Sequence, residues 1–140
     1  MQYKKFNDKY ILRLDKGEEV VGTLKKFCQE KSIKLASISG IGASNKIELG
    51  LFNTREKKYY SRALEQDFEI SSLIGNITEM DGKVYLHLHI TLGDKDQNTF
   101  SGHLNSAIIS GTCEIIIHAI NGEVDRKFSN EIGLNLLEFN

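Results

Sequence analysis

The chain has 140 residues, with 18 lysines and arginines against 19 aspartates and glutamates, and a formal net charge of −1. This balance excludes a polycation, and the length suits one domain with a single core. Hydrophobic residues make up 40% of the chain, but no apolar run approaches the roughly 20 residues of a membrane helix.

The N-terminal ten residues carry Lys4, Lys5 and Lys9 and have no apolar core. Neither a signal peptide nor a lipidation signal is readable there, so the expected compartment is the cytoplasm. The two cysteines, Cys28 and Cys113, are too few for a disulfide scaffold. We expect both to be reduced and buried as small hydrophobic side chains.

A strand and a helix are predicted first along the chain. Isoleucine and leucine alternate with polar residues over 10–14, as in a strand. Asp15, with Glu18 three residues later, has the pattern of a helix N-cap. We therefore predict a helix of about 15 residues that begins near Asp15. Its core-facing side chains would be Val20, Val21, Leu24, Phe27 and Cys28.

After Ile33 the hydrophobic period changes to two, which is typical of strands. The predicted strands are 36–39, 46–52, 57–62, 68–77, 84–92, 99–104 and 107–120. Turns are predicted at Gly40 with Gly42, Asn53-Thr54, Asp81-Gly82, Gly93-Asp94 and Asn121-Gly122. The segment 134–139 fits either a strand or one helical turn.

The chain contains no proline, and it shows no linker or internal repeat. We therefore predict one α+β domain over residues 1–140, with a largely antiparallel sheet of about seven strands and one main helix near the N-terminus. A cupin fold is a minor alternative, because Gly82, His87, His89 and Asp94 have nearly the spacing of a cupin metal motif.

The segment 83–92 carries the strongest chemical signal. Its strict alternation places Leu86, Leu88, Ile90 and Leu92 on one face of a strand and Tyr85, His87, His89 and Thr91 on the other. The Cα atoms of His87 and His89 would then be about 6.6 Å apart, a spacing at which two imidazoles can bind one metal ion. A turn over 93–97 could return His103 to the pair.

Three neutral imidazoles with an open coordination position resemble catalytic rather than structural zinc sites. We therefore expect a divalent transition metal at His87, His89 and His103, with zinc first and iron, manganese or nickel also compatible. The alternative is a histidine-lined strand that faces solvent or a subunit contact. His118 is expected to be a structural or surface residue.

Basic residues gather in the first half of the chain, where residues 1–70 hold 14 basic and 10 acidic side chains. Four of these cations, Arg55, Lys57, Lys58 and Arg62, lie in one run with two tyrosines. Such a run is most often a solvated hairpin, and it is also where a weak nucleic-acid contact would form.

Several short motifs occur in a fixed order along the chain. They are Arg13 with Gly17-Glu18, the segments 39–43, 68–70 and 73–77, His87-x-His89, Gly102-His103-Leu104, Glu114 and Arg126. Together they resemble the PPC domain, also called PCC, over about residues 9–138. That family includes stand-alone bacterial and archaeal proteins and the domain that follows the AT-hooks of plant nuclear proteins.

The resemblance implies an α+β fold that assembles as a homotrimer, and it carries the family label of a candidate DNA-binding protein. The apolar run 115–117 also suggests that both faces of its strand are covered. An AT-hook is excluded because its core requires proline. The net charge of −1 supplies little phosphate neutralisation, so any DNA binding is expected to be weak.

The resemblance also supports the three-histidine site, because the same fold group includes acetolactate decarboxylase, whose zinc is held by a similar His-x-His and a later histidine. Glu69, Glu114, Arg13 and Arg62 are candidates to act beside the metal, a carboxylate by moving a proton and a guanidinium by holding a substrate carboxylate. The two glutamates could equally form interface ion pairs.

Two functions therefore remain open at this stage. One is a PPC-domain protein with a DNA-binding role by family label and a three-histidine metal site. The other is a metal-dependent small-molecule enzyme, similar to the decarboxylase, or a metal-containing small-molecule sensor without DNA binding.

Overall fold

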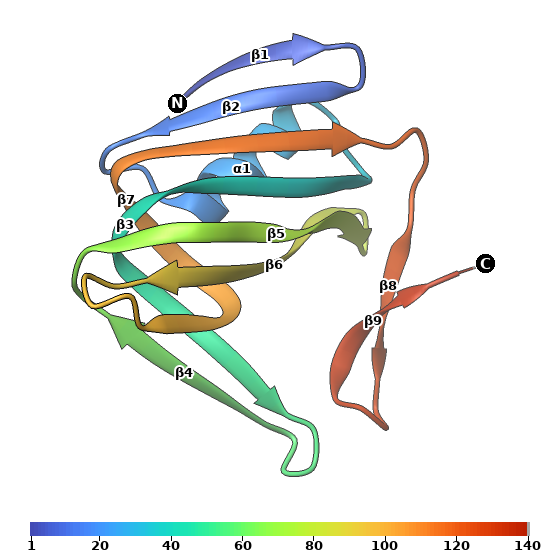
Figure 1. The fold of residues 1–140 in the computed structure, drawn as a ribbon. Coiled ribbons are helices and arrows are strands. Elements are labelled where there is room, and N and C mark those ends of the chain that lie inside the picture. The colour runs from blue at the N-terminus through green and yellow to red at the C-terminus, as the bar shows by residue number, and fades with distance from the viewer. Residues whose placement is uncertain (140) are drawn as a thin grey trace.

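A seven-stranded antiparallel sheet packs against a single helix in the computed structural model, which describes residues 1–139 (Figure 1). The sheet contains β1 (Gln2–Phe6), β2 (Lys9–Asp15), β3 (Ala36–Asn53), β4 (Lys58–Leu64), β5 (Phe68–Met80), β6 (Lys83–Gly93) and β7 (Thr99–Ala119), and the helix is α1 (Val20–Glu30). β8 (Asp125–Ser129) and β9 (Leu134–Glu138) form a separate two-stranded sheet. The predicted fold class is confirmed.

Four strands of the sheet form a closed circuit of pairings. β3 pairs with β5, β5 with β6, β6 with β7, and β7 again with β3. This is possible because β3 and β7 are long, so each has different neighbours along its length. The circuit brings the second half of β6, from His89 to Gly93, beside the first residues of β7.

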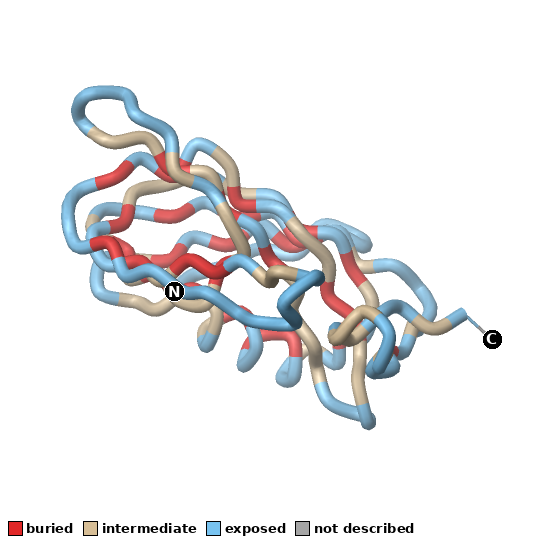
Figure 2. The backbone as a smooth tube through the Cα atoms, turned by 90° about the horizontal axis from the view of Figure 1, so that it is seen from below, coloured by how far each residue is buried: buried red, intermediate tan, exposed pale blue. Residues whose placement is uncertain are grey.

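The core lies between the sheet and α1, and buried positions alternate with exposed ones along the strands (Figure 2). The helix buries Val20, Leu24, Phe27 and Cys28 against it. The expected start of the helix at Asp15 is wrong, because the N-cap is Glu19, whose carboxylate accepts hydrogen bonds from the backbone N–H groups of Val21 and Gly22. Glu18 instead accepts from the backbone N–H of Asp15.

The predicted turn at Gly40 and Gly42 is also wrong, because β3 runs through both residues with a local bulge. A Cβ on Gly42 would lie 2.4 Å from the carbonyl oxygen of Thr112. The glycine is therefore needed for the close approach of β3 and β7. The segments predicted as two strands, 99–104 and 107–120, likewise belong to one strand, β7. Its pairing with β3 shifts register near Asn105, but the strand does not end there.

Two strands escaped the sequence analysis, and the tail is resolved as a strand. Every residue of β1 is exposed, and within residues 1–139 this strand pairs with β2 alone, so it lacks the apolar alternation of a core strand. Among the described residues β8 pairs with β9 alone, and this pairing shows that the tail over 134–138 is a strand. Within residues 1–139, α1 falls short of the length and apolarity that a membrane span requires.

Candidate metal centre

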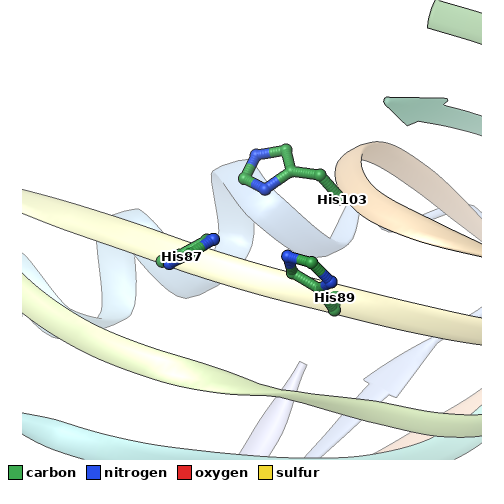
Figure 3. A group of neighbouring side chains, drawn as sticks. All are labelled: His87, His89 and His103. Atoms are coloured by element: carbon green, nitrogen blue, oxygen red, sulfur yellow. The ribbon is translucent and has the colours of Figure 1, made fainter. Parts of the chain in front are cut away.

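Three histidine side chains meet on one face of the sheet (Figure 3). His87 and His89 project from β6 and His103 from β7. One ring nitrogen from each residue can be chosen so that the three atoms lie within 4.8 Å of one another. The ring centroids are 5.2 Å apart for His87 and His89, 5.4 Å for His87 and His103, and 5.7 Å for His89 and His103.

Strand alternation and one hairpin position these rings. On β6, Leu88, Ile90 and Leu92 are buried in the core, so His87 and His89 point to the opposite face. The hairpin from β6 to β7 is closed by Asp94, whose carboxylate accepts hydrogen bonds from the backbone N–H groups of Asp96 and Asn98. This turn sets a register in which His103 lies directly opposite His89.

The electrostatic surroundings favour neutral imidazoles. Burial, followed by the charge of Arg126 and the neighbouring histidines, lowers the pKa of His87 below its ordinary value of 6.5. Burial, followed by His89, lowers the pKa of His103 in the same way. Since a metal ion binds the neutral form of imidazole, the two lowered pKa values leave these rings available as ligands near neutral pH.

A cavity of about 700 Å³ opens in front of the three imidazoles. It is bounded by the sheet face, by the end of β3 with β4, and by the β8–β9 hairpin. Its lining residues are Gly50, Leu51, Phe52, Tyr59, Asn76, Tyr85, His87, His89, Ser101, Gly102, His103, Arg126, Leu134, Asn135, Leu136 and Leu137. The three-histidine cluster therefore has room for a small molecule beside it.

The four proposed helper residues lie elsewhere, and none is among the described residues that line this cavity. Glu114 is opposite Arg13 on neighbouring strands, and Arg13 donates a hydrogen bond to Asp15. Glu69 is exposed at the start of β5, and Arg62 lies over the ring of Phe100. A role for these four residues beside the metal therefore stays a prediction.

The fourth histidine and the two cysteines are separate from the cluster. The Nε2 atom of His118 lies 2.7 Å from a carboxylate oxygen of Asp8 on the surface. Both cysteines are buried and free. Burial raises the pKa of Cys28 to about 12 and that of Cys113 to about 11, so neither is a reactive thiolate.

Arg126 is the cavity residue that sequence reasoning missed as a functional group. It lies on β8, a strand without a clear apolar period, and it reaches the site through contacts with residues about 50 positions earlier in the chain. Its place in the ordered motifs was the single signal that marked it.

The comparisons with known proteins agree with this architecture. The model of the Plants and Prokaryotes Conserved (PCC) domain matches residues 1–121. The chain belongs to the PCC-domain family. A comparison with curated proteins finds no match. Because the chain is a PCC-domain protein, the cupin alternative is dropped. β8, β9 and Arg126 lie beyond the residues that the family model matches.

Solved structures cover the chain almost completely. A candidate DNA-binding protein from Bacteroides thetaiotaomicron is 40% identical, with a TM-score of 0.96 and coverage of 99% of this chain and 96% of that chain. A metal-containing protein from Archaeoglobus fulgidus is 34% identical, with a TM-score of 0.89 and 99% coverage of both chains. A plant- and prokaryote-conserved protein from Pyrococcus horikoshii is 31% identical, with a TM-score of 0.86 and coverage of 99% and 94%.

Proposed function

We propose that this PCC-domain protein binds one divalent transition metal ion, with zinc first, through His87, His89 and His103, and that it presents this ion to a small molecule. The observation that carries the proposal is the approach of three imidazoles, with ligand nitrogens within 4.8 Å of one another, at the edge of a cavity. The similar protein from Archaeoglobus fulgidus is described as metal-containing, which supports it.

The residues present fit such an ion. The candidate ligands are all imidazole nitrogens, a donor set that suits zinc, iron or nickel and does not suit calcium or magnesium. A metal held at about 2.0–2.1 Å from each nitrogen needs ligands about 3.3 Å apart. Binding a metal would therefore draw together the three nitrogens, which lie within 4.8 Å of one another.

A metal with three protein ligands keeps an open position, where it supplies a Lewis acid or an activated water. The protein's own residues would position the small molecule. The polar side chains that line the cavity beside the histidines are those of Tyr59, Asn76, Tyr85, Ser101, Arg126 and Asn135. Either an enzyme or a sensor is compatible with this arrangement.

The test compares two single substitutions, His89→Ala and His118→Ala, in protein purified without a histidine tag and dialysed after zinc loading. Atomic emission should find about one zinc per chain in the wild type and in His118→Ala, and little in His89→Ala. Circular dichroism should show that all three are folded. A wild-type chain that cannot be loaded, or equal loss in both variants, would show that the site is misassigned.

Nucleic-acid contact is a second candidate function, favoured by one surface feature. Four exposed cations follow the turn between β3 and β4 and continue along β4: Arg55, Lys57, Lys58 and Arg62. The similar protein from Bacteroides thetaiotaomicron is described as a candidate DNA-binding protein. Four cations give few phosphate contacts, so the binding would be weak, indifferent to sequence and shallow in its salt dependence.

Fluorescence anisotropy with two duplexes of different sequence tests this second function. We expect weak and equal binding that falls when Lys57 and Lys58 are changed to glutamine. Tight binding at physiological salt that discriminates between the duplexes would instead support a true DNA-reading role.

The partner we propose is two further copies of the chain in a homotrimer. The sheet face opposite α1 exposes Ile11, Ile41, Ile74 and Ile116, with exposed fractions between 39% and 57%. Ile11 on β2 lies opposite Ile116 on β7. Ser39, on β3 between β7 and β5, lies opposite both Ile116 and Ile74. A contiguous apolar patch of this kind on a sheet is typical of an interface between subunits.

A further inference from the structure

Arg126 is a buried cation whose protein partners are all neutral. Its side chain is 7% exposed. The guanidinium donates from Nε to Thr78 Oγ1 at 2.8 Å, from Nη1 to the Asn135 carbonyl at 2.9 Å, and from Nη2 to Asn76 Oδ1 at 2.8 Å. Tyr85 lies against it, with its ring centroid 4.6 Å from Cζ.

Within residues 1–139, no carboxylate forms an ion pair with this guanidinium. Charges this deeply buried are normally paired, because removing them from water is costly. The four neighbours supply hydrogen bonds and a π face, which orient the cation without neutralising it. An anion is therefore the missing complement.

The cation also retains free donors. A guanidinium has five N–H groups, and the three hydrogen bonds above use three of them. Two N–H groups, one on each terminal nitrogen, remain. Arg126 lines the same cavity as His87, His89 and His103, so an anion bound to these two groups would lie close to the histidine cluster.

Besides Arg126 and the histidines, the cavity wall combines neutral polar side chains with a large apolar part. Leu51 and Phe52 at the end of β3 line it on one side, and Leu134, Leu136 and Leu137 of β9 line it on another. No lysine is among the described residues that line it. The occupant should therefore combine one small anionic group with an apolar portion.

We propose that Arg126 binds the carboxylate of a small organic acid, with the apolar part of the acid against the leucines of β9 and the carboxylate beside the metal site; this last placement rests on the proposed function. Two N–H groups in a fork match the two oxygens of a carboxylate. Arg126 is the single arginine or lysine among the described residues that line the cavity, so the side chains there balance the one charge of a carboxylate better than the two of a phosphate dianion.

Three probes of matched size or charge test the chemistry of this site. They are 3-methylbutanoate, the uncharged alcohol 3-methylbutan-1-ol, which has the same carbon skeleton, and inorganic phosphate. Calorimetric titration of the zinc-loaded and the metal-free chain should show that the carboxylate binds at least about tenfold more tightly than either competitor. Equal binding of acid and alcohol, or tighter binding of phosphate, would overturn the proposal.

The variant Arg126→Gln should weaken carboxylate binding by about tenfold or more while leaving zinc content unchanged. Arg13→Gln is the matched control, since Arg13 is exposed and pairs with Asp15. Undiminished binding in a folded Arg126→Gln variant contradicts the assignment. Zinc content is measured separately, and the metal-free titration tests Arg126 even if zinc cannot be loaded, so failure of the metal site and failure of the carboxylate site are distinguishable.

Arg126 also holds the β8–β9 hairpin to β5, so its replacement could impair folding. In that case the wild-type chain decides the question by NMR of the Arg126 guanidinium, read at the signal of its terminal Nη–H groups. A shift of this signal on adding 3-methylbutanoate, without a shift on adding the alcohol, supports the proposal. An unmoved signal at saturating acid refutes it.

Discussion

His89 on β6 and His103 on β7 lie directly opposite each other in an antiparallel pair, with ring centroids 5.7 Å apart. The hairpin that joins their strands sets this register. A slip by one residue would move His103 to the other face of its strand and away from His89. The same cross-strand row continues from His89 to Ile74, so the cluster borders the exposed isoleucine patch.

Zinc occupancy should depend on pH in a defined direction. Burial lowers the pKa of His87 and of His103 below 6.5, so the neutral form of both imidazoles predominates at pH 6.5 and above. Occupancy should therefore be constant above this pH and fall below it as protons compete for the nitrogens. Equilibrium dialysis between pH 5 and pH 8 measures this. Loss of zinc already between pH 8 and pH 7 would contradict the neutral, partly buried environment of the ligands.

Gly75→Ala should disturb the site from β5, the strand that pairs with β6 beside His87. A Cβ at Gly75 would lie 2.0 Å from the backbone oxygen of His87, which cannot move without breaking the pairing of β5 with β6. We expect the free energy of unfolding to fall by about 1–3 kcal/mol and zinc occupancy to fall with it.

The matched control is Gly111→Ala, whose Cβ would meet Ala43 at an ordinary contact distance of 3.8 Å. Urea denaturation and zinc analysis compare the two variants. If Gly75→Ala is as stable as Gly111→Ala, the close approach at His87 does not constrain the strand.

Glu19→Ala should destabilise the start of α1. The Glu19 carboxylate accepts from the backbone N–H groups of Val21 and Gly22, and also from that of Ala107 on β7. Losing this cap should cost about 1–2 kcal/mol of unfolding free energy. Glu30→Ala, which removes only an exposed partner of Lys26, should cost less than about 0.5 kcal/mol. Urea denaturation that finds equal losses would show that Glu19 is not the effective cap.

Light scattering should give a mass of about three times 15.8 kDa for the wild-type chain at micromolar concentration. Ile41 is 57% exposed on the apolar patch, so Ile41→Asp should favour the monomer by placing a charge in the interface. Lys25→Asp on the exposed side of α1 is the control and should leave the mass unchanged. A wild-type monomer would refute the homotrimer.

Local patterns predicted much of the molecule because they depend on the backbone alone. In any strand, alternate side chains point to opposite faces, so 83–92 placed Leu88 in the core and His87 with His89 on one face before any partner was known. The helical face from Val20 to Cys28 follows from the same kind of argument. The turn over 93–97 was predictable from its own residues, because they include types that adopt the backbone angles of a tight turn.

The tertiary structure decided the features that depend on contacts between distant residues. Gly40 and Gly42 look like a turn in sequence, but they serve the packing of β3 against β7, an interaction invisible to a local pattern. Glu69 and Glu114 have suitable chemistry, but neither is among the described residues that line the cavity. Arg126 lines the cavity, and its hydrogen bonds to Thr78 and Asn76 hold the guanidinium there. Such long-range pairings depend on the total energy of the folded chain. The residues next to Arg126 in the sequence therefore do not indicate them.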